Sequence, residues 1–506
     1  MSPEPLSRRL LLGGAVTAGT GAAVGGMLGP EAAYAAPVAW KVFFVEHPGG
    51  TPNQTAIQTA LTEAGTAGGG HVVVSRGTWN VTTAPLRIFA NTRLTLTPGT
   101  VLRRTGTVSS MLRNGPNDGS DTTTGGHNGP GNIFIEGGVW DANAPTVTTP
   151  GWAMVFAHAK NITIRDVQIL NVAEYHAIEL NSTYNALVEG CSFIGSTPRP
   201  SAVWNQEAVS MDLAAPSLVP WGAGDNTQCR LIRVVNNYCE NWPTFAGCHT
   251  GLSTSGHEEF VIAGNTVRNL DYWGVSLRNT SRAVVSGNTM VNVGGGVWIR
   301  CHDDPANPPR RSNRGVVIAD NVIETTKRDE GIRIIGANGG TAGDGQIYTA
   351  SITGNVVRRT AKSGIRVEWA PEVVVGDNSV HITTGPGIEA PNSTAAMISG
   401  NHVRDADREG ILVTGGTDHQ IAGNSLVNPC RATDAVRDAV VFAGVGKACV
   451  QGNKITSITP RPRYAIASDA ASSGIFYPNN DVRDGYATGA FNLLGSGHIS
   501  APGNAT

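Results

Sequence analysis

The chain has 506 residues, 64 of them glycine, with 15% charged residues and a formal net charge of −2 at pH 7. This length allows a large hydrophobic core, and the glycine content is above the usual share. A chain without a basic excess is poorly suited to bind phosphate backbones, so we expect no nucleic-acid partner. No segment after the N-terminal region reaches the roughly 18 apolar residues that a membrane span needs.

The N-terminal residues 1–35 are typical of an export signal. Arg8 and Arg9 precede an apolar run rich in Gly and Ala, and Ala33-Tyr34-Ala35 offers the small residues of a cleavage site. The segment resembles a twin-arginine signal, a route that carries folded proteins. An uncleaved membrane anchor is the alternative. We therefore expect a secreted mature protein with no membrane segment after cleavage.

The segment that follows predicts a capped stack of strands. The stretch TAIQTALTEAG, from Thr55 to Gly65, predicts a short amphipathic helix that closes the open end, and the strand HVVVSRGTWNV comes next. We expect an N-terminal cap and first coils over 36–125, a β-helix over 126–480, and a C-terminal cap or tail over 481–506.

An internal repeat predicts the fold. Phrases such as VIAGNTV, VVSGNTM and SITGNVV recur, and their asparagines are separated by 23, 33, 34, 23, 23, 23 and 29 residues. Cys191 and Asn237, which are 46 residues apart, extend the pattern upstream. One asparagine per turn predicts an internal ladder of stacked amides. The ladder positions are Asn265, Asn288, Asn321, Asn355, Asn378, Asn401, Asn424 and Asn453.

A second phrase in each turn opens on glycine and then alternates, as in GVSLRN, GVWIRC and GIRVEW. Alternation with period two predicts strands. Short strands in a 23-residue turn, with little helical period, predict an all-β, single-stranded right-handed parallel β-helix. The opening helix and these coils resemble the pectate-lyase-like superfamily of polysaccharide-active β-helices.

Alternation also predicts which side chains point outward. The position two residues after the glycine predicts a column of Glu179, Ser210, Ser253, Ser276, Trp298, Arg333, Arg366 and Glu389. The position four residues after it predicts a column of Asn181, Asp212, Ser255, Arg278, Arg300, Ile335 and Glu368. Two residues before the glycine we expect Tyr175, Gln206, His249, Tyr272 and Lys362 on the same face.

The stretch EAVSMDL, from Glu207 to Leu213, is the candidate catalytic strand. Val209 and Met211 are expected to point inward, so Asp212 points outward. Carboxylates closer than about 6 Å raise one another's pKa, which can supply an acid and a base at one pH. The predicted catalytic residues are Asp212, Glu207, Asp225 and His249.

Substrate-binding candidates lie on the same face and in adjoining loops. Tryptophans over a groove commonly stack on sugar rings, and guanidinium groups bind carboxylates in a bidentate manner. The predicted substrate-binding residues are Glu179, Arg278, Arg300, Trp298, Arg333, Arg366, Trp204 and Trp221. The partner they predict is a polysaccharide with uronate units.

The stretch GCHTGLSTSG, from Gly247 to Gly256, resembles the histidine motif of polygalacturonase-type hydrolases, and GVSLRN stands where that family has R-I-K. The resemblance implies that His249 is the active-site histidine and Arg278 the substrate-binding cation. The chain lacks the family's N-T-D and adjacent D-D motifs at the expected place. These departures favour a distant relative with its own set of carboxylates.

Three functions remain open at this point, and the carboxylates interleaved with His249 and Arg278 favour acid–base hydrolysis. A glycoside hydrolase needs an acid and a base but no cofactor, and we expect no metal there. A polysaccharide lyase or uronate epimerase would need a cation, for which Ca²⁺ is the candidate. A non-catalytic adhesive β-helix would need only the groove. Seven cysteines without a C-x-x-C pair argue against structural zinc; Cys430 and Cys449 are either a disulfide or free thiols.

Overall fold

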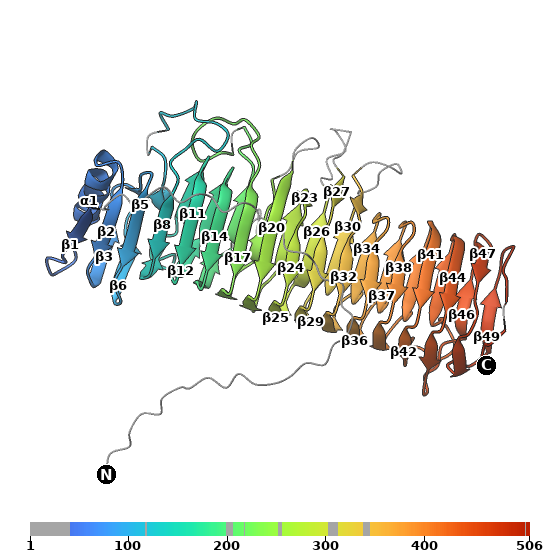
Figure 1. The fold of residues 1–506 in the computed structure, drawn as a ribbon. Coiled ribbons are helices and arrows are strands. Elements are labelled where there is room, and N and C mark those ends of the chain that lie inside the picture. Colours follow the sequence, from blue (N-terminus) through green and yellow to red (C-terminus); the bar gives the residue numbers. More distant parts are fainter. Residues whose placement is uncertain are drawn as a thin grey trace, which may run out of the picture. The chain divides into compact units, whose positions relative to one another are not determined.

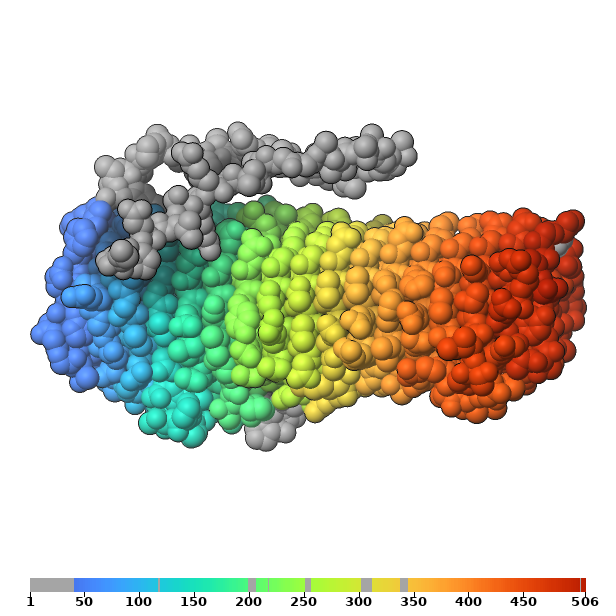
Figure 2. All heavy atoms as spheres, turned by 90° about the horizontal axis from the view of Figure 1, so that it is seen from below, coloured from blue at the N-terminus to red at the C-terminus, as the bar shows by residue number. Residues whose placement is uncertain are grey.

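The structure is a computed structural model that describes residues 41–116, 119–198, 206–216, 218–250, 256–301, 312–336, 345–500 and 502–506. The chain forms a right-handed parallel β-helix, as the repeat predicts, and all pairings between the described strands are parallel. The export-signal residues lie outside the described part. Within that part, no helix is long and apolar enough to cross a membrane. Figure 2 shows that successive segments follow one another along the stack in sequence order.

Helix α1 (Thr55–Thr66) covers the N-terminal end of the stack (Figure 1), where the sequence predicts it. Its apolar face buries Ile57, Ala60, Leu61 and Ala64 in the hydrophobic core. The first coil of the stack would otherwise leave its core open to water. The amphipathic helix removes this apolar surface from solvent.

Each regular coil contributes one strand to each of three sheets. The first sheet consists of β1 (Val42–Val45), β2 (Gly70–Val74), β5 (Thr92–Leu96), β8 (Ile133–Glu136), β11 (Lys160–Arg165), β14 (Tyr184–Glu189), β17 (Arg230–Val235), β20 (His257–Ala263), β23 (Thr280–Ser281), β24 (Val284–Ser286), β28 (Val317–Ala319), β32 (Ser351–Thr353), β35 (Val374–Gly376), β38 (Met397–Ser399), β41 (Thr417–Ala422), β44 (Gly446–Gln451) and β47 (Ser473–Phe476).

The second sheet consists of β3 (Gly77–Val81), β6 (Thr100–Arg104), β9 (Val139–Asp141), β12 (Gln168–Ala173), β15 (Ser192–Thr197), β18 (Tyr238–Glu240), β21 (Thr266–Arg268), β25 (Thr289–Val293), β29 (Val322–Thr326), β33 (Val356–Thr360), β36 (Ser379–Thr383), β39 (His402–Ala406), β42 (Ser425–Val427), β45 (Lys454–Thr456) and β48 (Asp481–Asp484).

The third sheet carries the candidate site. It consists of β4 (Leu86–Arg87), β7 (Ser110–Arg113), β10 (Trp152–Ala157), β13 (Ile178–Asn181), β16 (Glu207–Asp212), β19 (Thr244–Gly247), β22 (Trp273–Arg278), β26 (Gly295–Arg300), β30 (Ile332–Ile335), β34 (Ile365–Glu368), β37 (Ile388–Pro391), β40 (Ile411–Thr414), β43 (Val440–Ala443), β46 (Tyr464–Ser468) and β49 (Gly489–Leu493). The short strands β27 (Asn313–Arg314) and β31 (Ile347–Tyr348) pair separately. β48 and β49 continue the coils into the segment 481–506.

The predicted asparagine ladder is present in the core. The side-chain amide of Asn355, for example, donates to the carbonyl of Ile318 and to Oδ1 of Asn378, both at 2.9 Å. Its own Oδ1 accepts from the amide of Asn321 at 2.9 Å. Each buried amide therefore has partners for its donors and its acceptor. The ladder begins at the backbone N–H of Cys191 and continues beyond Asn453 to Asn480 and Asn504.

All seven cysteines are free thiols, six of them buried, so the Cys430–Cys449 disulfide does not form. Burial raises the pKa of the Cys191 thiol to about 12. Two of the thiols lie directly beneath the candidate site. Cys229 donates to the carbonyl of Asp212 at 3.3 Å, and Cys248 accepts from the backbone N–H of Arg278 at 3.1 Å.

Candidate functional site

The outward direction of the candidate catalytic strand follows from its core residues. Val209 and Met211 of β16 are fully buried in the hydrophobic core. Because side chains alternate along a strand, Ser210 and Asp212 lie on the opposite face of the third sheet. This agrees with the direction that the alternation in EAVSMDL predicts.

Strand pairing places the polar side chains of neighbouring coils side by side. Glu179 of β13 pairs with Ser210, and Asn181 pairs with Asp212. Ser210 pairs in turn with Gly247 of β19. Asp212 is therefore one coil away from Glu179 and diagonal to it across the two strands.

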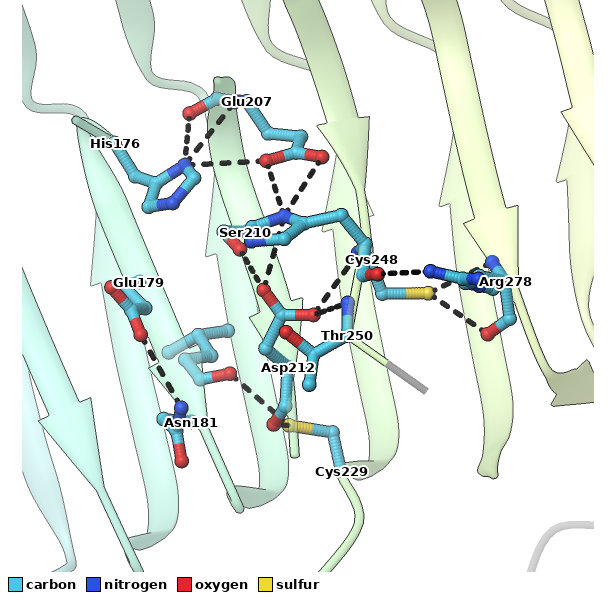
Figure 3. Close-up of polar contacts among 12 residues, drawn as sticks. His176, Glu179, Asn181, Glu207, Ser210, Asp212, Cys229, Cys248, Thr250 and Arg278 are labelled. Atoms are coloured by element: carbon cyan, nitrogen blue, oxygen red, sulfur yellow. Dashed lines mark hydrogen bonds and ion pairs between the residues drawn. The ribbon is translucent and has the colours of Figure 1, made fainter. Parts of the chain in front are cut away.

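Hydrogen bonds hold both oxygens of Asp212 (Figure 3). Its Oδ1 accepts from the backbone N–H groups of His249 at 3.1 Å and Thr250 at 2.9 Å. Its Oδ2 accepts from the hydroxyl of Ser210 at 2.8 Å and lies 3.3 Å from Nδ1 of His249. That same Nδ1 lies 3.0 Å from Oε2 of Glu207. One imidazole thus bridges two carboxylates that belong to the same strand.

The ionised forms of Asp212 and His249 stabilise each other. Burial by itself would lower the pKa of His249, but the charges of Asp212 and Glu207 outweigh it and raise that pKa to about 9. Burial would raise the pKa of Asp212, but the charge of His249 and the N–H of Thr250 outweigh it and lower that pKa. At neutral pH, His249 is therefore a cation and Asp212 an anion.

His176 belongs to the cluster and was not among the residues predicted from the sequence. Its Nδ1 lies 3.3 Å from Oε2 of Glu207, and its ring stacks on His249 with centroids 5.4 Å apart at 25°. Burial lowers the pKa of His176, so this imidazole is neutral at pH 7. The sequence does contain a signal for His176. It directly precedes Ala177, as Glu207 directly precedes Ala208, and the strands that follow these alanines pair in register.

Glu179 differs in charge from Asp212. It is 5% exposed, and Asn181 donates to its Oε1 at 3.3 Å. Burial, followed by the charge of Asp212, raises the pKa of Glu179 to about 8. The group is therefore protonated at neutral pH, which makes it a proton donor rather than an anionic contact for substrate.

The structure corrects the register expected for the coil that contains His249. The glycine-led repeat predicts Gly251 as the leading glycine of this coil and Ser253 beside Ser210. Gly247 occupies that place instead, two residues before His249; Gly251, Ser253 and Ser255 lie outside the described residues. A Cβ on Gly247 would lie 2.5 Å from the carbonyl of Ser276 and 3.2 Å from Cγ of Glu207. The glycine therefore leaves room for the Glu207 side chain.

Three donor atoms of the cluster are close enough together to bind a metal ion. One atom each from His176, Glu207 and His249 lie within 4.8 Å of one another. Two imidazoles and a carboxylate suit a transition metal better than Ca²⁺, which prefers oxygen ligands alone. In the structure these same atoms contact each other directly, as hydrogen-bonded or ion-paired groups.

Asp225 lies in the loop after β16, where it organises backbone rather than joining the cluster. Its Oδ2 accepts from the N–H of Gly126 at 2.7 Å, and its Oδ1 accepts from the N–H of Thr227 at 3.0 Å. Within the described part of the chain, no hydrogen bond or ion pair connects Asp225 to Asp212. Its contacts fasten this loop to the loop after β7.

Trp221 is a correction to the predicted sugar platform. It is 4% exposed, and its indole N–H donates to Oδ1 of Asn114 at 3.1 Å. The ring lies where a Cβ on Gly115 or Gly129 would have to be. Because the two loops pack on each other, Trp221 is buried between them. Trp204 lies outside the described residues.

The predicted columns of the arginine-rich face are confirmed by strand pairing. Arg278 pairs with Arg300, and Arg333 pairs with Arg366. Nη1 of Arg333 lies 4.0 Å from Oε2 of Glu330, and Arg366 contacts Glu389 at 2.6 Å and Glu368 at 2.9 Å. The charge of Arg366 is compensated on both sides, so we remove it from the group of anion-binding candidates.

Trp298 contacts arginines instead of presenting a bare ring. The guanidinium of Arg300 lies 3.9 Å from its ring centroid and that of Arg333 lies 5.4 Å away. Trp273 lies 5.3 Å away. Cation–π contacts of this kind orient the buried Arg300 and the partly exposed Arg333. The correction is that two guanidinium groups lie over the Trp298 ring, which is therefore not a bare stacking platform.

Two surface hollows of the described chain lie away from this cluster. One of about 550 Å³ lies between α1 and residues 83–89. The other, of about 430 Å³, is lined by Glu258, Ser281, Arg282, Ser312 and Arg314. Neither contains a residue of the cluster around Asp212.

Comparison with known proteins supports the fold. Residues 311–454 match the family model described as right handed beta helix region. The plasmin and fibronectin-binding protein A of Streptococcus pneumoniae is 21% identical over 372 residues, which is 65% of this chain and 51% of that protein. The chain therefore spans about half the length of the curated relative it matches.

Two solved structures share the architecture at low identity. PfbA, a surface adhesin of Streptococcus pneumoniae, aligns with a TM-score of 0.61 and 20% identity over 71% of this chain and 88% of that one. The tailspike protein of E. coli bacteriophage HK620, in complex with a pentasaccharide, aligns with a TM-score of 0.58 and 11% identity over 88% and 76%. These likenesses show the fold.

Proposed function

We propose that the chain is a secreted glycoside hydrolase that cleaves an acidic, uronate-containing polysaccharide with Glu179 as acid and Asp212 as base. The observation that carries this proposal is the placement of two carboxyl groups on adjacent coils of one face, with their pKa values moved in opposite directions. Paired carboxyl groups in different environments are how glycosidases obtain an acid and a base at one pH.

We propose inversion, on the separation of the backbone positions that carry the two carboxyl groups. Diagonal residues on adjacent strands have Cα atoms about 8 Å apart, given a spacing of about 4.8 Å and a rise of about 3.3 Å per residue. Carboxyl groups about 6.5–9.5 Å apart leave room for the attacking water of an inverting enzyme. Protonated Glu179 would protonate the leaving oxygen, and ionised Asp212 would accept a proton from that water.

His249 has a supporting role in this scheme. Its side chain is 20% exposed, compared with 1% for Glu207 and 4% for Asp212. It is therefore the part of the cluster that a sugar reaches first. Its cationic form keeps Asp212 ionised, while Glu207 and the stacked ring of His176 orient it.

The arginines support an acidic substrate. Arg278, whose Nη1 donates to the carbonyl of His249 at 2.9 Å, starts the cationic part of the face, and Arg300 and Arg333 continue it over Trp298. Guanidinium groups bind carboxylates in a bidentate geometry, which would hold a uronate beside the acid and base.

Incubation of the secreted protein with polygalacturonate, hyaluronan, alginate and dextran tests the proposal. A hydrolase releases reducing ends from an acidic polymer without forming an unsaturated product. Product formation should require both Glu179 and Asp212. No new reducing ends from any acidic polymer, with binding retained, would contradict hydrolysis.

A lyase or epimerase is a second candidate because His176 and His249 are stacked and differ in charge at neutral pH. Such a pair could remove and return a proton next to a uronate carboxylate. In the same assay, a lyase would produce unsaturated uronate absorbance, and an epimerase would change sugar configuration without any new chain ends.

A non-catalytic adhesive protein is the third candidate, and the similarity in fold to a streptococcal surface adhesin favours it. In that case the acidic glycan would bind with unchanged length and configuration, and Asp212→Asn would alter affinity alone.

A further inference from the structure

A pair of aromatic rings lies beside the candidate acid, on the side away from the arginines. Trp152 opens β10, and Tyr175 directly precedes His176 on the next coil. Their ring centroids are 4.4 Å apart and the planes differ by 28°, so the rings are stacked. Both residues are partly exposed. Stacked, partly exposed rings provide a flat apolar surface of the kind that sugar rings contact.

The Trp152 ring of this pair lies close to the carboxyl group of Glu179. The indole nitrogen of Trp152 is buried and has no partner in good hydrogen-bonding geometry. It is nevertheless close to the Glu179 carboxyl. Burial and the charge of Asp212 raise the pKa of Glu179, and the Trp152 N–H opposes this rise as the smallest of several influences. A ring stacked on Trp152 would therefore lie against the group that donates the proton.

The charges near the pair differ from those on the other side of the cluster. Arg104 is buried and donates to the carbonyl and hydroxyl of Thr149 and the carbonyl of Pro150. Arg113 donates to the carbonyl of Pro220 at 3.0 Å. These two guanidinium groups therefore donate hydrogen bonds to carbonyl and hydroxyl oxygens of the protein itself. Toward the C-terminal coils, by contrast, Arg333 lies over Trp298 with 23% of its side chain exposed, and its Nη1 lies 4.0 Å from Oε2 of Glu330.

We propose that Trp152 and Tyr175 form a subsite for an uncharged sugar unit, so that the substrate presents a neutral ring on one side of the scissile bond and a uronate on the other. The inference rests on the proposed function, because Glu179 and Asp212 define where the scissile bond lies. It implies a heteropolymer that combines neutral and acidic units rather than a polyuronate.

Binding to a protein that does not turn over tests this subsite. The Asp212→Asn chain is titrated with oligosaccharides of equal length from hyaluronan, in which uronate and N-acetylglucosamine alternate, from polygalacturonate and from dextran. We expect hyaluronan to bind at least about tenfold more tightly than the other two. Adding Trp152→Ala should weaken hyaluronan binding by about tenfold and polygalacturonate binding by less than about twofold, because only the neutral ring stacks there.

Two further variants separate stacking from folding. Trp152→Phe keeps a ring and should retain most of the hyaluronan affinity. Phe44→Ala, which removes an aromatic ring that is 71% exposed on β1, is the matched control and should change nothing. The subsite proposal is wrong if hyaluronan binds no more tightly than polygalacturonate. It is also wrong if Trp152→Ala weakens hyaluronan binding no more than it weakens polygalacturonate binding. The proposed hydrolysis is tested independently of the subsite: it is wrong if the wild-type chain binds with this preference but releases no reducing ends.

Discussion

Asp212 and His249 contact each other through both main chain and side chain. The backbone N–H of His249 donates to Oδ1 of Asp212 at 3.1 Å, and Nδ1 of the same histidine lies 3.3 Å from Oδ2. One carboxylate thus positions the start of the segment after β19 and balances the charge of its imidazole. Because Asp212 is buried and the His249 side chain is only 20% exposed, their electrostatic attraction is stronger than that of a fully exposed pair.

Replacing Asp212 by asparagine should reduce turnover at least about 100-fold, since an amide cannot act as a base in the reaction. The side chain keeps its shape, and its carbonyl oxygen can still accept the N–H bonds of His249 and Thr250. We therefore expect a folded variant with the circular-dichroism spectrum of the wild type. Asp484→Asn, at an exposed position of β48, is the matched control. Full activity of Asp212→Asn would remove this residue from the catalytic machinery.

The pH profile of kcat/KM should be bell-shaped if Glu179 is the acid. The pKa of Glu179 is raised to about 8, so activity falls as pH rises through about 8 and the proton is lost. The pKa of Asp212 is lowered from 3.8, so the acid limb lies below that value. A Trp152→Phe variant, which loses the N–H near Glu179, should move the alkaline limb to higher pH. An alkaline limb that stays in place in that variant would show that another group causes it.

His249 should contribute stability that depends on pH. Its pKa is raised in the folded state from 6.5 to about 9. The contribution is therefore fully present below pH 6.5, as long as Asp212 is ionised, and it is lost as pH rises through about 9. Thermal unfolding of wild type and His249→Gln, compared from about pH 6 to about pH 10, should show a gap that closes at the alkaline end. A gap that widens with pH would mean that the imidazole is not held as a cation.

Replacing a ladder asparagine should destabilise the stack. Asn355→Ala leaves the carbonyl of Ile318 and the amide of Asn321 without a partner in the core. Each such loss costs about 1–3 kcal/mol. Urea unfolding should therefore show a free energy of unfolding lowered by at least about that amount. Gln451→Ala, on the exposed surface of β44, should stay within about 0.5 kcal/mol of wild type. Equal effects of the two substitutions would contradict a structural role for the ladder.

Much of the site's framework follows from local pattern. The spacing of 23 residues between Asn355, Asn378 and Asn401 is one coil, and the amides stack as that spacing predicts. The alternation around Val209 and Met211 predicts the outward direction of Asp212 because strand side chains alternate whatever surrounds them. Such features depend on residues that are neighbours in sequence or one repeat apart.

Errors arose where the repeat is interrupted. The phrase GLSTSG looks like a coil strand, but β19 is formed by the four residues Thr244–Gly247 upstream of it. An insertion changes which residue enters the column, and periodicity cannot detect the shift of six residues from Ser253 to Gly247. His176 was missed for a different reason: its coil was placed correctly, but His176 directly precedes Ala177, and that position belongs to none of the predicted columns.

The sequence by itself determined the β-helix, its capping helix, the asparagine ladder and the face on which Asp212 lies, because each depends on a short period or on alternation. Only the tertiary structure decided that Trp221 is buried between two loops, that Arg366 is neutralised by Glu389 and Glu368, and that His249 lies between Glu207 and Asp212. The physical reason is that burial and charge pairing depend on which side chains from different coils and loops meet. These contacts between coils and loops set the protonation states of the site. A repeat pattern along the sequence does not specify such contacts.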